Sequence, residues 1–118
     1  MPAKNPQSVV LVVEDEIESR DTLRELLELE GYTVRTAADG KAALEVLDTV
    51  EPCVVLLDLF MPVMSGWQVI DRLRADGRLG KMNVLVITSA KHTAPADLPV
   101  LEKPLNLDKL IRTVDAVC

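Results

Sequence analysis

The chain has 118 residues, 48% of them hydrophobic and 27% charged, which indicates a single soluble globular domain rather than a disordered chain. Its formal net charge is −6 and its basic residues are scattered, which argues against nucleic-acid or anionic-membrane partners. No apolar run approaches the roughly 20 residues that span a bilayer, and residues 1–8 lack the regions of a signal peptide. We therefore expect a cytoplasmic protein.

The chain has two cysteines, Cys53 and Cys118. Cys53 lies at the head of a buried apolar run and Cys118 is the last residue, so we expect a packed thiol and a loose one, as suits a cytoplasmic protein, rather than a disulfide. Their spacing does not suggest a metal site.

The first half of the chain alternates between strand and helix patterns. Residues 1–7 are polar and predict a flexible N-terminal tail, and residues 8–118 form the domain. The expected elements are a strand over 8–13, a helix over 16–30 that ends at Gly31, a strand over 32–37, and a helix over 41–50 that is N-capped by Asp39. The apolar positions of the first helix include Ile17, Leu23 and Leu27.

The second half continues the same alternation. Residues 54–57 form an uninterrupted apolar run that ends in Asp58, which is typical of a strand buried on both faces. A helix follows from Ser65, with Gln68 completing a capping box, to about Asp76. Strands are expected over 84–87 and 100–101, and Asn106 caps a last helix whose apolar face includes Val117. The alternation predicts a parallel sheet with helices on both faces.

Polar side chains follow each central strand at the same end. They are Glu14 and Asp15 after the first strand, Asp58 after the third, Thr88 after the fourth and Lys103 after the fifth. In a doubly wound sheet these ends share one edge, so the five side chains are expected to meet in one pocket. The plainer alternative is that each is a solvated or capping residue of its own loop.

The chemistry of this residue set favours phosphoryl transfer. Three close carboxylates repel one another, and a hard cation such as Mg²⁺ with oxygen ligands relieves the repulsion. A lysine and a hydroxyl suit the oxygens of a phosphoryl group. Asp58, which is central, is the candidate nucleophile and would form an acyl phosphate.

Four segments carry a resemblance to a known family. They are VVEDE over 12–16, LLDLFMPVMSGW over 56–67, VITSA over 86–90 and EKP over 102–104. Together they resemble the receiver domain of two-component response regulators over nearly the whole chain. The resemblance implies a flavodoxin-like, five-stranded parallel sheet in the order 2-1-3-4-5.

The resemblance also implies a role for each pocket residue. Asp58 would accept a phosphoryl group from a histidine kinase, Thr88 would bond the phosphoryl oxygen, and Lys103 would pair with the phosphate. The Mg²⁺ ligands would be Asp15 directly, Glu14 through water, Asp58, and the backbone carbonyl of Phe60. Pro104 would follow a cis peptide bond, and Gly66 would serve the turn before the third helix.

The chain departs from the family pattern between its fourth and fifth strands. The aromatic residue that the family places three positions before the lysine is Val100 here. Only residues 90–98 join the two strands, and Pro95 lies among them, so the family's fourth helix should be shortened or absent. His92 is expected to be a solvated loop residue. We expect one sheet face to be under-covered, and a partner or a second copy of the chain would shield it.

Three aromatic or small residues near the pocket carry further expectations. Phe60 and Ala90 lie two residues after Asp58 and Thr88, and neither side chain can hydrogen-bond an attacking water, which predicts slow autodephosphorylation. Trp67 is expected to pack against its own loop rather than to contact a partner.

These observations predict a phosphoacceptor that is not an enzyme in its own right and that signals through an unidentified downstream protein. We expect no output domain after the last helix, and the chain either signals by protein contact or is a piece of a longer protein. One alternative is a pseudo-receiver that takes no phosphate. The other is a phosphohydrolase of the haloacid-dehalogenase kind, whose Asp-x-Asp segment is Glu14-Asp15-Glu16 here.

Overall fold

The computed structural model of the protein describes residues 8–118, so the tail expected over residues 1–7 lies outside the described part. Five parallel strands form one sheet in the order β2-β1-β3-β4-β5, which confirms the expected topology. The strands are β1 (Val9–Val13), β2 (Thr33–Ala37), β3 (Val54–Asp58), β4 (Val84–Thr88) and β5 (Val100–Glu102).

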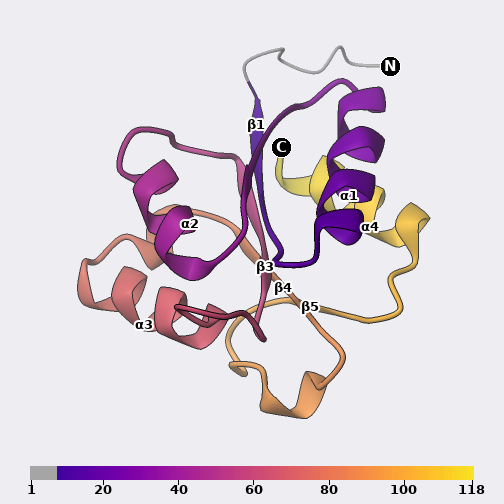
Figure 1. The fold of residues 1–118 in the computed structure, drawn as a ribbon. Coiled ribbons are helices and arrows are strands. Elements are labelled where there is room, and N and C mark those ends of the chain that lie inside the picture. The colour runs from indigo at the N-terminus through magenta and orange to yellow at the C-terminus, as the bar shows by residue number, and fades with distance from the viewer. Residues whose placement is uncertain (1–7) are drawn as a thin grey trace.

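Helices cover both faces of the sheet: α1 and α4 lie on one face, and α2 and α3 lie on the other (Figure 1). The bounds are α1 (Ile17–Leu29), α2 (Gly40–Leu47), α3 (Gly66–Ala75) and α4 (Leu107–Val117), with short 3₁₀ turns η1 (Leu79–Lys81) and η2 (Lys91–Thr93). The expected N-caps at Asp39, Ser65 and Asn106 are confirmed, and Ser65 forms the full capping box with Gln68. None of the helices within residues 8–118 is long and apolar enough to cross a bilayer.

The core consists of two apolar layers separated by the sheet. Because successive strand residues point to opposite faces, Leu11 and Val13 of β1 pack beneath α2 and α3, while Val10 and Val12 pack beneath α1 and α4. Every residue of β3 and β4 is buried, as the unbroken apolar runs predict. The two buried strands thus fix the position of Asp58 and Thr88 at one edge of the sheet.

Some helix positions differ from the sequence expectation. Helix α2 ends at Leu47, so Val50 lies outside it. Ile17 is 61% exposed and Val117 is 42% exposed, although both fit the apolar spacing of their helices. Both residues occupy the terminal turns of their helices.

The connection between β4 and β5 contains only the single 3₁₀ turn η2, which confirms the absence of a full helix there. Exposed His92 lies in this turn, as expected for a solvated loop residue. The expectation of an under-covered sheet is wrong for β4, because Ala94 and Leu98 of the connection pack against the core layer that contains buried Val84 and Val86. At β5, Val100 remains only partly buried.

The expectation of two separate thiols is also wrong. Cys53 and Cys118 form a disulfide with their Cα atoms 5.4 Å apart. Helix α4 runs back along the sheet from its carboxyl edge, so the end of α4 lies beside the residue that precedes β3. The 65-residue separation hides this proximity in the sequence.

Candidate functional site

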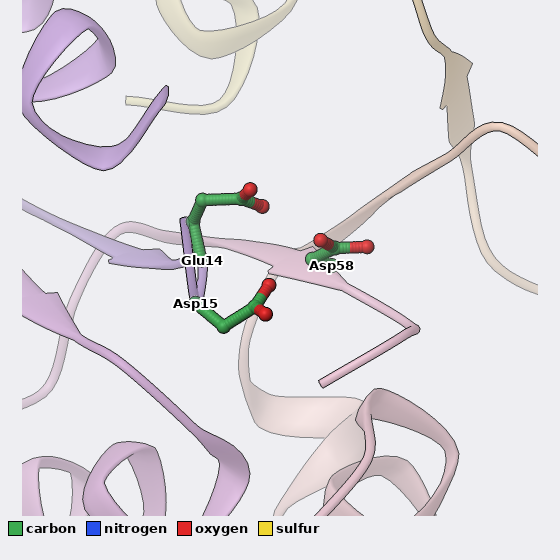
Figure 2. A group of neighbouring side chains, drawn as sticks. All are labelled: Glu14, Asp15 and Asp58. Carbon is green, nitrogen blue, oxygen red and sulfur yellow. The ribbon is translucent and has the colours of Figure 1, made fainter. Parts of the chain in front are cut away.

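The carboxyl ends of the strands bring the expected pocket residues together. Glu14 and Asp15 extend from the end of β1 and face Asp58 at the end of β3 (Figure 2). One carboxylate oxygen from each of the three lies within 4.8 Å of the others. Glu14 and Asp58 are buried, while Asp15 is exposed and borders the solvent. The pocket therefore places two desolvated acids beneath a solvated one.

Lys103 is the cation of the pocket. Its Nζ lies 3.2 Å from Asp58 Oδ2 and 3.4 Å from Glu14 Oε2, and its side chain is about one-third exposed. Its backbone amide donates to the Thr88 carbonyl, which fixes the residue against the end of β4. The Lys103–Pro104 peptide bond is cis, as expected.

The buried charges shift two pKa values in this pocket. Burial raises the pKa of Glu14 to about 7, and the hydrogen bond and negative charge of Asp58 act in the same direction. The charge of Lys103 opposes these effects only in part. Burial acts to lower the pKa of Lys103, but the charges of Asp58 and Glu14 outweigh it and hold the pKa above its ordinary value. The Glu14 carboxyl therefore changes its protonation state near neutral pH, whereas Lys103 stays charged there.

Thr88 and Phe60 complete the pocket through backbone contacts. The Thr88 side chain is fully buried, and its Oγ1 accepts a hydrogen bond from the Ala90 amide at 3.0 Å. The Phe60 amide donates to Asp58 Oδ1 at 3.3 Å, which orients the carboxylate. Phe60 itself is 51% exposed.

Gly66 matters because of a close approach and not because of an unusual turn. A Cβ at this position would collide with the Asp58 carbonyl oxygen and would lie 2.8 Å from Leu59 Cα. The Gly66 amide donates to the Leu59 carbonyl at 2.9 Å. The start of α3 thus packs directly on the backbone that carries Asp58, and only glycine leaves room for it.

Two features of the site have no sequence signal. Val63 adopts a positive φ of 66°, which a β-branched residue rarely does, in a tight turn closed by the Met64 amide on the Pro62 carbonyl. Arg20 Nη1 donates to the Glu14 carbonyl at 3.0 Å and holds the loop between β1 and α1. An arginine in the second turn of a helix is ordinary, so only the folded loop reveals this contact.

Fold and site together define a doubly wound α/β domain with an acidic, lysine-containing pocket at its carboxyl edge. Residues 10–115 match the response regulator receiver domain, and the chain belongs to this family. Among its relatives, the response regulator MprA of Mycolicibacterium vanbaalenii is 33% identical over 115 residues, which cover 92% of this chain and 49% of MprA. The transcriptional regulatory protein SphR of Synechococcus elongatus is 39% identical over 78% of this chain and 38% of SphR. The chain thus spans about half the length or less of these relatives.

Solved structures give the same family. The chemotaxis response regulator CheY4 of Vibrio cholerae superimposes with a TM-score of 0.82 at 30% identity, covering 94% of this chain and 98% of CheY4. The response regulator TrrA of Thermotoga maritima, solved in complex with Mg²⁺-BeF, gives a TM-score of 0.82 at 30% identity, covering 94% of this chain and 99% of TrrA. The chain is therefore a receiver domain of two-component signalling.

Proposed function

We propose that Asp58 is the phosphoacceptor of this receiver domain. The observation that carries the proposal is a buried Asp58 carboxylate, 5% exposed, whose Oδ2 lies 3.2 Å from Lys103 Nζ at the edge of the sheet. The Lys103 ammonium and the Phe60 amide together fix the orientation of this carboxylate, as a nucleophile requires.

The reaction is transfer of a phosphoryl group from a phosphohistidine of a histidine kinase. A carboxylate oxygen of Asp58 forms the new O–P bond, the N–P bond of the phosphohistidine breaks, and the imidazole leaves with the electron pair. Lys103 neutralises the phosphoryl charge from its place between Asp58 and Glu14. The Thr88 hydroxyl would donate to a phosphoryl oxygen, because one hydroxyl can donate while it accepts from Ala90.

The residues of the pocket fit a Mg²⁺ ion. Three carboxylates with ligand oxygens within 4.8 Å of one another form a hard, all-oxygen donor set, and one of them opens to solvent. Asp15 and Asp58 would bind the ion directly, Glu14 through a water, and the Phe60 carbonyl would complete the protein ligands. When bound, Mg²⁺ supplies charge neutralisation for the phosphoryl oxygens. The pKa of Glu14 is raised because its negative charge is unfavourable in this buried place beside Asp58, and a bound cation would stabilise that charge.

A groove beside the pocket supports docking of the kinase. It has a volume of about 560 Å³ and runs between α1 and the β5–α4 connection, and its lining includes Glu18, Leu23, Leu105 and Leu107. Lys103 also lines it, so a helix that binds there would bring its histidine to the pocket. The downstream protein is the receiver's second partner. A cytoplasmic location fits a kinase partner, whereas the Cys53–Cys118 disulfide is of a kind that is rare in cytosolic proteins.

Two alternatives remain distinguishable by experiment. A pseudo-receiver would keep the fold without accepting phosphate, and its motivation is Val100 at the family's aromatic position. A haloacid-dehalogenase-type phosphohydrolase would hydrolyse phosphate monoesters, but here the first strand is followed by Glu14-Asp15-Glu16 rather than Asp-x-Asp.

Intact-mass measurement after incubation with acetyl phosphate and Mg²⁺ tests the proposal. We expect a gain of one phosphoryl group, about 80 Da, in the wild type and none in the Asp58→Asn variant. EDTA should prevent the gain. An unmodified wild type would leave the pseudo-receiver, and turnover of a generic phosphate monoester would revive the hydrolase.

A further inference from the structure

The short connection between β4 and β5 is tied to α3 by two polar contacts. The Trp67 indole Nε1 donates to the Thr93 carbonyl at 3.0 Å, and Arg74 makes a two-pronged ion pair with Asp97 at 2.7 and 2.9 Å. The Arg74–Asp97 pair is far along α3, whereas Trp67 sits on its first turn, next to the pocket loop. Trp67 is also the chain's only tryptophan.

On one side, Trp67 reaches Asp58 through a single residue. Its ring meets the Phe60 ring edge to face, with centroids 4.9 Å apart and an interplanar angle of 87°. The Phe60 amide in turn donates to Asp58 Oδ1 at 3.3 Å. A change in the charge or direction of the Asp58 carboxylate therefore acts on the residue that Trp67 contacts.

On the other side, Trp67 reaches Thr88 through the η2 turn. The Thr93 amide and Oγ1 both donate to the Ala90 carbonyl, at 2.9 and 2.7 Å. The Ala90 amide donates to Thr88 Oγ1 at 3.0 Å. The contacts thus form a continuous path from Asp58 through Phe60, Trp67, Thr93 and Ala90 to Thr88.

We propose that Trp67 is a positioning residue that couples the state of Asp58 to the conformation of residues 90–98. This inference rests on the proposed function of Asp58. A phosphoryl oxygen on Asp58 draws the Thr88 hydroxyl toward it, and the Ala90 amide must follow that hydroxyl or lose its acceptor. If the Ala90 amide follows the hydroxyl, the turn that holds the Thr93 carbonyl moves with it. If the amide stays, that turn loses a hydrogen bond that anchors it. In both cases the Trp67 contact changes with phosphorylation. Trp67 would thus couple the pocket to the β4–β5 connection in a chain whose residue at the family's aromatic position, Val100, has no ring.

Tryptophan emission tests the coupling directly, because all of it comes from Trp67. The protein is treated with Mg²⁺ and fluoroberyllate, a tetrahedral stand-in for a phosphoryl group, and Asp58→Asn serves as the control. We expect an emission change in the wild type alone. Hydrogen exchange of the amides over residues 91–98 should rise about tenfold in the same state, which corresponds to the loss of about one hydrogen bond.

A pair of variants separates coupling from simple anchoring. Trp67→Phe keeps a ring against Phe60 but removes the N–H, so exchange over 91–98 should start high and no longer respond to fluoroberyllate. Arg74→Gln removes the other anchor and should raise the starting exchange while preserving the response.

The outcomes distinguish this inference from the proposed function. If acetyl phosphate adds a phosphoryl group to Asp58 but neither Trp67 emission nor exchange over 91–98 changes, the coupling role is overturned and the phosphoacceptor stands. A Trp67→Phe protein that keeps the full response also overturns it. If no phosphoryl group is added, the proposed function fails and the coupling falls with it.

Discussion

The carboxyl and amino ends of the parallel strands, called here the carboxyl and amino edges of the sheet, differ in buried charge and in backbone strain. The carboxyl edge gathers buried acids, a positive φ at Val63 and a backbone collision avoided only by Gly66. The amino edge is bonded without such strain: the Cys53 amide donates to the Val9 carbonyl, Asn83 Nδ2 donates to the Cys53 carbonyl, and the disulfide ties Cys53 to Cys118. The site thus lies at the end of the sheet that carries the buried acids and the strained backbone. The contacts at the opposite end stabilise the fold and offset the cost of that strain.

Removing the disulfide should give the largest loss of stability and leave the pocket intact. Closing a 65-residue loop stabilises the fold by about 2 to 4 kcal/mol through the entropy of the unfolded chain. Chemical denaturation should show this loss in Cys118→Ser, in Cys53→Ser and in the double variant alike. Phosphorylation of Asp58 by acetyl phosphate should not change, and a matching loss of phosphorylation would contradict the separation of the two edges.

Adding a methyl group at Gly66 should damage the carboxyl edge. We expect Gly66→Ala to lose about 3 kcal/mol of stability and most of its phosphorylation, because the start of α3 must move off the Asp58 backbone. Gly80→Ala is the matched control, since a Cβ there meets nothing within 4 Å. Thermal denaturation and intact mass together measure both effects, and equal behaviour of the two variants would remove the close-approach argument.

The strain on Glu14 should appear as a pH dependence of stability. Because the pKa of Glu14 is raised from 4.5 to about 7, the unfolded state loses this proton first as the pH rises. The free energy of unfolding therefore falls by up to about 3 kcal/mol between pH 4.5 and 7 and then levels off. The raised pKa of Lys103 acts only above this window.

Glu14→Gln provides the control for that slope. Its unfolding free energy, measured by urea titration from pH 4.5 to 8, should lack the Glu14 part of the decline. Mg²⁺ should stabilise the wild type most above pH 7, where protons no longer compete for the carboxylates, and EDTA should remove the gain. Parallel pH profiles for the two proteins would show that folding does not raise the pKa of Glu14.

The acyl phosphate should be long-lived because neither Phe60 nor Ala90 offers a side chain that orients water. A Phe60→Asn, Ala90→Glu double variant should lose its phosphoryl group about tenfold faster, which is about 1.4 kcal/mol in the barrier. Decay is followed by intact mass after removal of acetyl phosphate. Phe60→Leu alone, which adds no polar group, should not speed decay, and an unchanged rate in the double variant would refute the expectation.

The smallest expected effect is a gain at Val63. The side chain is 77% exposed, so Val63→Asn relieves the positive φ of 66° without losing packing, and we expect about 1 kcal/mol of added stability. Val63→Ala removes the branch at Cβ but has no polar group to hydrogen-bond the local backbone, so it should gain less than Val63→Asn. The urea midpoints of both variants measure the difference, and equal midpoints would mean that the turn carries no strain.

The sequence by itself predicted a parallel sheet and the members of the pocket, and the strand order 2-1-3-4-5 followed from its resemblance to receiver domains. Unbroken apolar runs such as Val54–Leu57 identify buried parallel strands, and the polar residues after Val13, Leu57 and Ile87 must then share one edge. The caps at Asp39, Ser65 and Asn106 were equally readable because they depend on neighbours three residues away. Local patterns carry this information because strand and helix periodicities are local.

Only the tertiary structure decided which distant residues touch. The Cys53–Cys118 bond, the path from Trp67 to Thr93, and the burial of Val84 by the shortened connection all join segments that no sequence period relates. Ile17 likewise fits the apolar spacing of α1 but is 61% exposed, which the spacing alone does not predict. These features follow from how elements pack across the sheet, and packing is fixed by three-dimensional proximity rather than by spacing along the chain.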